Sequence, residues 1–144
     1  MANETDLRRA VSDTYYALFH FTLVAAVDMV LGSSARSSTL YALVYRSVEH
    51  VRLRALCANV SASKPQVPFV PAGGFGEIAK FASIVANLYE QRNLADYDPS
   101  QTYTANKALW ISDAREAIKW FQGSTQEQQQ AFLTLLLLLF KPRP

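Results

Sequence analysis

Apolar side chains recur at helical spacing along most of the chain, and the pattern is clearest in residues 6–31. Spacings of three and four residues bring such positions to one side of a helix, so this segment is predicted to form one long helix. No formally charged residue occurs between Asp13 and Asp28. We therefore expect this helix to be central in the fold or to pack against a second subunit. Its main stripe consists of Leu7, Val11, Thr14, Leu18, Phe21 and Ala25, and its second apolar face of Tyr15, Phe19, Leu23, Ala26 and Val30.

The same periodicity predicts four more helices, over residues 38–60, 76–95, 104–122 and 124–140. Between the first two of these, residues 61–74 are predicted to form a loop, because closely spaced prolines remove backbone donors and fix φ. The loop holds Pro65, Pro68 and Pro71, and Phe69 and Val70 are expected to pin it to the body. The inward positions expected in the helix over residues 38–60 are Leu40, Val44, Val48, Val51 and Leu56.

The last predicted helix begins at Ser124, because Ser124 and Glu127 have the spacing of a capping box. Its residues 131–140 are apolar on all sides, but ten residues span only about 15 Å, which is too short for a hydrocarbon core of about 30 Å. We favour a helix buried in the domain. The alternative is an exposed helix through which a structural adaptor protein docks a partner.

Length and composition fit one globular domain over residues 1–144, since 50% of the chain is hydrophobic and 18% is charged. With long segments free of Gly and Pro, the predicted fold is all-α, an up-and-down bundle of four main helices plus a C-terminal helix. Cys57 is the single cysteine, so no intrachain disulfide can form and a reducing cytoplasm is expected. The N-terminal segment is polar and acidic before it is basic, and no apolar core follows a positive start, which argues against a signal peptide. No membrane partner is expected.

Neither a metal site nor a cofactor is predicted. The metal-binding side chains His20, His50 and Cys57 do not have a known ligand spacing. The glycines at residues 73–76 lack the lysine of a phosphate-binding P-loop and do not follow a strand, so they are interpreted as structural punctuation. The net charge of +2 is too small to predict nucleic-acid binding by itself.

A cluster of polar side chains occurs at the predicted end of the third helix. It consists of Arg92, Asn93, Asp96 and Tyr97. The planar guanidinium of an arginine can hold a phosphate through several donors. A purely structural interpretation is also open, because Arg92 and Asp96 are four residues apart and can pair on a helix surface. Tyr97 can then be an ordinary packing residue.

Two sequence segments together resemble the HEPN superfamily of prokaryotic helical domains. The first is RRAVSDTYYALFH at residues 8–20, and the second is RNLADY at residues 92–97. They look most like the branch whose third helix ends in Arg-x-x-Ala-Asp-Tyr. The resemblance implies a helical domain, a homodimer, and activity either as an RNA-cutting toxin or as a partner of a nucleotidyltransferase. The matching residues are Arg9, Ser12, Tyr15, Tyr16, His20, Arg92, Ala95, Asp96 and Tyr97.

The chain departs from the active ribonucleases of that family, which place a histidine a few residues after the arginine. Here those positions hold Tyr97, Asp98 and Pro99, so the usual general acid or base is missing. The expected function is therefore binding of RNA, a nucleotide or a protein partner in a toxin–antitoxin or defence-type system. The expected ligand-binding residues are Arg92, Asn93, Arg9 and Tyr16.

The alternative function is a metal-independent ribonuclease at a dimer cleft, with Arg92, His20, Asp96 and Tyr97 as the candidate catalytic residues. His20 would then face the Arg92–Asp96 turn, whereas a histidine on an apolar helix is more often a hydrogen-bonded core residue. His50 lies four residues after Arg46 on a polar face and is expected to be solvated. Six arginines could form one basic surface for nucleic acid if helices one to three are adjacent: Arg8, Arg9, Arg46, Arg52, Arg54 and Arg92.

Overall fold

A computed structural model describes residues 4–97 and 107–138 of the chain. These residues form six α-helices and one short 3-10 helix, and they include no strand, so the predicted all-α class is confirmed for this part. In chain order the elements are α1 (Glu4–Leu31), η1 (Ser33–Ala35), α2 (Thr39–Arg46), α3 (His50–Val60), α4 (Ile78–Tyr97), α5 (Lys107–Gly123) and α6 (Gln126–Leu137).

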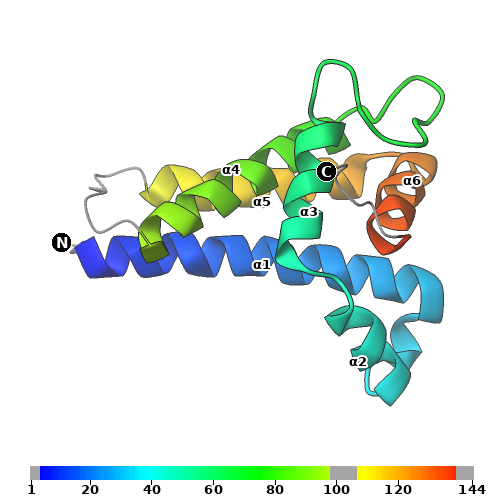
Figure 1. Ribbon diagram of the computed structural model, residues 1–144, viewed down its shortest axis with the longest axis horizontal. Coiled ribbons are helices and arrows are strands. Elements are labelled where there is room, and N and C mark those ends of the chain that lie inside the picture. The colour runs from blue at the N-terminus through cyan, green and yellow to red at the C-terminus, as the bar shows by residue number, and fades with distance from the viewer. Residues whose placement is uncertain (1–3, 98–106, 139–144) are drawn as a thin grey trace.

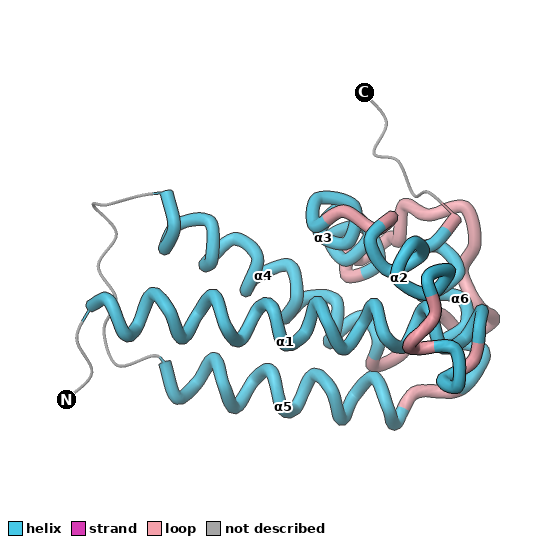
Figure 2. The backbone as a smooth tube through the Cα atoms, turned by 90° about the horizontal axis from the view of Figure 1, so that it is seen from below, coloured by secondary structure: helices cyan, strands magenta, loops and turns pink. Residues whose placement is uncertain are grey.

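Three long helices, α1, α4 and α5, lie along one another, with α4 running opposite to the other two (Figures 1 and 2). Helix α3 crosses this group and packs mainly against α4, while α6 covers α1, α3 and α4 at the end remote from the N-terminus. Helix α2 projects from the body beside the C-terminal end of α1 (Figure 1). The arrangement is therefore a bundle of three long helices that all contact one another, with shorter helices packed across it at one end.

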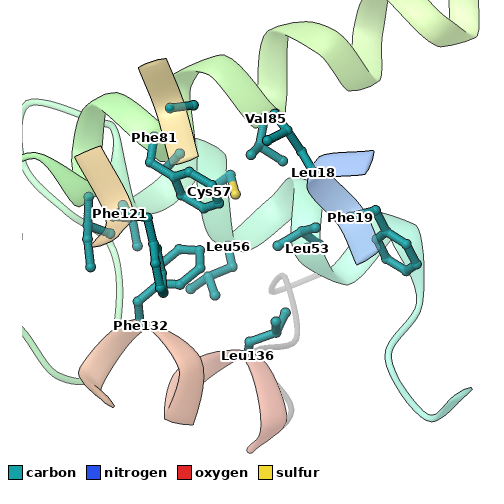
Figure 3. Close-up of a cluster of buried hydrophobic side chains, with 14 of the residues drawn as sticks. Leu18, Phe19, Leu53, Leu56, Cys57, Phe81, Val85, Phe121, Phe132 and Leu136 are labelled. Atoms are coloured by element: carbon teal, nitrogen blue, oxygen red, sulfur yellow. The ribbon is translucent and has the colours of Figure 1, made fainter. Parts of the chain in front are cut away.

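The hydrophobic core lies where α1, α3, α4, α5 and α6 converge (Figure 3). Phe81 of α4 occupies its centre and contacts the rings of Phe21, Phe121 and Phe132, with centroid distances of 5.1–6.3 Å. Such tilted and edge-on ring pairs stabilise the fold beyond the burial of their apolar area. From α1 the fully buried apolar side chains recur at helical spacing: Val11, Tyr15, Leu18, Leu23, Ala26 and Val27.

Residues 8–31 of α1 are long and apolar enough to cross a membrane by length and composition. A buried core helix meets the same test. In this fold α1 packs against α2, α4, α5 and α6, so burial within the domain accounts for part of its apolarity.

The prediction of one continuous helix over residues 38–60 is wrong, because the segment forms two helices, α2 and α3, separated by a turn. The Ser47 hydroxyl donates to the Val44 carbonyl at 2.6 Å, and Glu49 has extended backbone angles of φ −85° and ψ 149° as the N-cap of α3. Val48 is buried at the break, so tertiary packing of this side chain favours the turn. The break also exposes Leu40 and Val51, by 57% and 50%, although both were predicted to face inward.

Helix α2 is held to the body by a polar contact. The buried Tyr41 donates its hydroxyl proton to Asp28 at the end of α1, over 2.8 Å, and Arg36 forms an ion pair with the same carboxylate. These hydrogen bonds hold the pKa of Asp28 below its usual value, the contact with Arg36 being the larger cause.

The loop after α3 and the start of α6 differ in detail from their predictions. Phe69 and Val70 are exposed, by 52% and 40%, whereas Pro71 and Phe75 are buried. The capping box uses Thr125 and Gln128, one residue later than predicted. Helix α6 itself is core, as favoured from the sequence, because its apolar side chains are buried: Ala131, Phe132, Leu133 and Leu136.

Candidate functional site

Arg92 of α4 meets two aromatic residues of α1. Its guanidinium carbon lies 5.1 Å from the centre of the Tyr16 ring and 5.5 Å from the centre of the Tyr15 ring. A guanidinium at this distance is attracted by the negative face of an aromatic ring. The contact joins the two sequence segments on which the family resemblance rests.

His50, the first residue of α3, completes the group. Its Nδ1 atom lies 2.9 Å from the Tyr15 hydroxyl oxygen, and its ring stacks on Phe19 with 3.8 Å between the centroids. The ring of Tyr16 meets His50 edge-on at 5.5 Å. The break between α2 and α3 is what brings His50 to this position. We call this group the Arg92 cluster, and it consists of Tyr15, Tyr16, Phe19, His50, Tyr89 and Arg92.

The Arg92 cluster has a buried base and an open rim. Tyr15 is fully buried, packed edge-on against Tyr89 at 5.6 Å between centroids. Tyr16 is 43% exposed, while His50 and Arg92 are half-buried. One exposed aromatic ring therefore lies beside a partly buried imidazole and a guanidinium whose Nε atom is buried.

Burial controls the ionisation of the two titratable groups that touch each other. Desolvation raises the pKa of Tyr15, and the nearby positive charge of Arg92 only partly opposes this. Desolvation also lowers the pKa of His50, and Arg92 lowers it further. At neutral pH the site therefore holds a protonated phenol and a neutral imidazole, with the charge carried by Arg92.

Of the residues predicted to bind a ligand, Arg92 and Tyr16 are brought into contact. Arg9 is exposed on α1, about two helical turns before Tyr16 and hence on the same side of that helix. Asn93 is half-buried beside Arg92 on α4. The backbone of Asp96 and Tyr97 belongs to the last turn of α4, but their side chains lie outside the described part of the structure.

His20 is not the core histidine that its apolar helix suggested. It is exposed, and its Nδ1 atom lies 2.8 Å from the hydroxyl oxygen of Tyr45 in α2. The histidine that accompanies Arg92 is instead His50, which was expected to be solvated. Ser47 and β-branched Val48 weaken a helix just before His50, but this weakening alone does not predict where the helix breaks.

The arginines proposed to share one basic surface have different surroundings. Arg54 pairs with Glu90 across α3 and α4 at 3.0 Å, and Arg46 donates to the Ala42 carbonyl of its own helix. The Nη1 atom of Arg52 is buried without a hydrogen-bond partner in the described part of the chain. Arg92 contacts the aromatic rings of the candidate site and so supplies positive charge there, with Arg9 further along α1.

Among the residues that the structure describes, no group of three or more His, Cys, Asp or Glu side chains is placed to hold a metal ion. Cys57 is fully buried, and burial raises the pKa of its thiol, so it belongs to the core rather than to a reactive site. In comparisons with known proteins, no family model, curated protein or solved structure matches this chain.

Proposed function

We propose that this chain is a HEPN-like, RNA-binding domain that acts in a toxin–antitoxin or defence-type system, with the Arg92 cluster as its RNA site. The observation that supports the proposal most strongly is the contact between Arg92 and the exposed Tyr16 ring, at 5.1 Å. It places a phosphate-binding cation beside a surface aromatic ring.

This combination suits single-stranded RNA better than a duplex. Unpaired bases stack on aromatic side chains, and a neighbouring arginine can hold the adjoining phosphate. Tyr16 offers a partly free ring, and Arg92 is held against it by packing rather than extended into solvent. A single nucleotide uses the same chemistry, so free AMP and GMP serve as competitors that separate a nucleotide receptor from an RNA receptor.

The test is an anisotropy titration of short fluorescein-labelled single-stranded RNA with the wild-type protein and with Arg92→Ala. Exposed Arg115 of α5 provides the matched control, because Arg115→Ala removes the same charge on another helix. We expect Arg92→Ala to lose roughly tenfold or more in affinity, as for a charge-assisted contact. Arg115→Ala should stay within about twofold if only non-specific charge is lost there. Equal losses in the two variants would contradict the proposal.

RNA cleavage is the second candidate function, and the position of His50 is the observation that favours it. A histidine and an arginine in one cluster can in principle supply proton transfer and charge stabilisation at a phosphate. The assay is incubation of RNA with purified protein in EDTA, beside Arg92→Ala. Cleavage by the wild type that disappears in Arg92→Ala supports the enzyme. If the wild type binds the RNA and leaves it intact, the binding function is supported.

We also propose that the domain works as a cytoplasmic homodimer, and a nucleotidyltransferase is the proposed protein partner. Exposed apolar side chains on α1 and α2 support an association of this kind: Val30, Leu40 and Leu43 are each more than half exposed. Sedimentation equilibrium of the purified chain tests the dimer, and a monomer at micromolar concentration would count against it.

A further inference from the structure

The contact between Tyr15 and His50 determines which ring nitrogen of His50 carries the proton. We infer that Tyr15 holds His50 in the Nε2–H tautomer, so that His50 acts in the Arg92 cluster as a hydrogen-bond donor to a phosphate oxygen and not as a general base. The phosphate part of this inference rests on the proposed function, whereas the tautomer stands on the geometry alone.

The first step concerns the Tyr15 hydroxyl, whose oxygen lies 2.9 Å from Nδ1 of His50. Tyr15 has no solvent exposure, and a buried hydroxyl proton must be donated to an acceptor to avoid a desolvation cost. Within the described residues, Nδ1 of His50 is the acceptor at hydrogen-bond distance from this oxygen. Burial raises the pKa of Tyr15, so the phenol keeps its proton at neutral pH.

The second step follows from the chemistry of imidazole. A neutral imidazole has one N–H and one lone pair, so a ring that accepts at Nδ1 carries its proton at Nε2. His50 is neutral at pH 7 because desolvation and the charge of Arg92 both lower its pKa. The ring of Phe19, which stacks on the imidazole, carries no charge and supplies no counter-charge.

The third step concerns access to Nε2. His50 is only part-buried, and within the described part of the chain its ring makes its hydrogen bond through Nδ1, which leaves Nε2 for a ligand. The guanidinium of Arg92 likewise has hydrogen-bond donors and no acceptor. Two side chains of the Arg92 cluster thus present N–H groups, which suits an anionic ligand oxygen. A general base would instead require the lone pair to be at Nε2.

The chain contains its own comparison in His20 and Tyr45. The same two kinds of group meet there at 2.8 Å, but His20 is exposed, so water can serve either ring nitrogen and no single tautomer is imposed. Only His20 and His50 are present among 144 residues, which makes the ring signals of the whole protein simple to assign.

The decisive experiment is ¹⁵N-resolved NMR of the histidine rings in the full chain at pH 7.5, with His20→Gln used to assign the signals. We expect the His50 ring to be protonated at Nε2 and unprotonated at Nδ1. In Tyr15→Phe we expect a shift towards a mixture of tautomers, since the phenol donor is gone. Protonation at Nδ1 in the wild type would overturn the inference. The wild-type spectrum decides this even if Tyr15→Phe does not fold.

The role of the donor is tested with two substitutions of His50. His50→Gln can still present an N–H group near the position of Nε2, whereas His50→Leu cannot. We expect His50→Leu to bind the labelled RNA roughly tenfold more weakly than His50→Gln, as for a lost hydrogen bond to a charged acceptor. Equal weakening in both, or RNA cleavage by the wild type that His50→Gln abolishes, would overturn the donor role. If the wild type binds no RNA, the proposed function fails, while the NMR result still decides the tautomer.

Discussion

Arg92 of α4 lies over the ring of Tyr16 of α1, with 5.1 Å between the guanidinium carbon and the ring centre. The two residues are far apart in sequence, and each belongs to one of the two segments on which the proposed HEPN assignment rests. Their contact turns two separate sequence features into one surface site. Because Tyr16 remains 43% exposed, its ring is available to a base while Arg92 is beside it.

Replacing Tyr16 therefore tests stacking separately from charge. Tyr16→Ala should weaken binding of single-stranded RNA by about 1–3 kcal/mol, the usual effect of removing one aromatic stacking platform. Tyr16→Phe should retain most of the affinity, because the ring rather than the hydroxyl contacts the base. Anisotropy titrations of labelled RNA measure both variants. Similar losses in Ala and Phe would show that stacking on this ring does not contribute.

Protonation of His50 should destabilise the folded protein. The pKa of His50 is lower in the folded state than its usual value of about 6.5, so the unfolded chain takes up the proton first as the pH falls. The free energy of unfolding should then be at its full value above about pH 6.5 and decrease as the pH falls towards the folded-state pKa. Among the described neighbours of the ring, Phe19 carries no charge, the buried phenol of Tyr15 keeps its proton, and Arg92 is positive, so none of them favours the protonated imidazole.

Urea unfolding of the wild type and His50→Gln between pH 5 and 7.5 measures this effect. The wild type should lose more stability over that interval than His50→Gln, which has no imidazole at this position. Parallel pH profiles for the two proteins would mean that His50 is not desolvated in the folded state.

Helix α6 should be essential to stability rather than free for docking. Phe132 is fully buried, and its ring lies 5.9 Å from that of Phe81. Phe132→Ala should reduce the free energy of unfolding by about 3–5 kcal/mol, through lost burial and a residual cavity. Leu138, just past the helix, is 73% exposed, so Leu138→Ala should change stability by less than about 0.5 kcal/mol. Comparable effects would place α6 outside the core.

The loop before α4 should be sensitive to a methyl group at Gly76 but less so at Gly73. Both glycines have positive φ, at +58° and +82°, so alanine is strained at each. Only at Gly76 would the added Cβ lie 2.7 Å from Nε2 of Gln128, whereas at Gly73 it meets nothing within 4 Å. Gln128 also caps α6, and displacing it should cost about 1 kcal/mol more.

Thermal unfolding of Gly76→Ala and Gly73→Ala measures the difference. We expect the lower Tm for Gly76→Ala. Identical Tm values would show that Gln128 moves aside without losing its cap.

Much of the helical framework could be predicted because it depends on local periodicity. Helices α1, α4, α5 and α6 begin and end within a few residues of their predicted bounds. The break before α3 could not be predicted, because residues 47–49 contain neither Gly nor Pro. There the turn is favoured by the burial of Val48. Burial depends on tertiary contacts, which cannot be deduced from the periodicity of one segment.

The candidate site also could be predicted only in part, because it depends both on local sequence motifs and on tertiary packing. Arg92 and Tyr16 could be singled out from the motif segments that contain them, but the histidine beside them could not. His20 belongs to the motif and points to Tyr45, while His50 reaches Tyr15 only because α3 starts where it does. Which histidine approaches Arg92 is thus set by the crossing of α3 over the long helices.

The central claim, that Arg92 contacts an RNA phosphate, is tested most directly by the salt dependence of binding. Affinity for single-stranded RNA should be measured over a series of KCl concentrations for the wild type, Arg92→Gln and Arg115→Gln. Loss of one phosphate contact should make the slope of log K against log salt shallower by about 0.7 in Arg92→Gln, with Arg115→Gln retaining the wild-type slope. A wild-type slope in Arg92→Gln would contradict the claim, because Arg92 would then neutralise no phosphate.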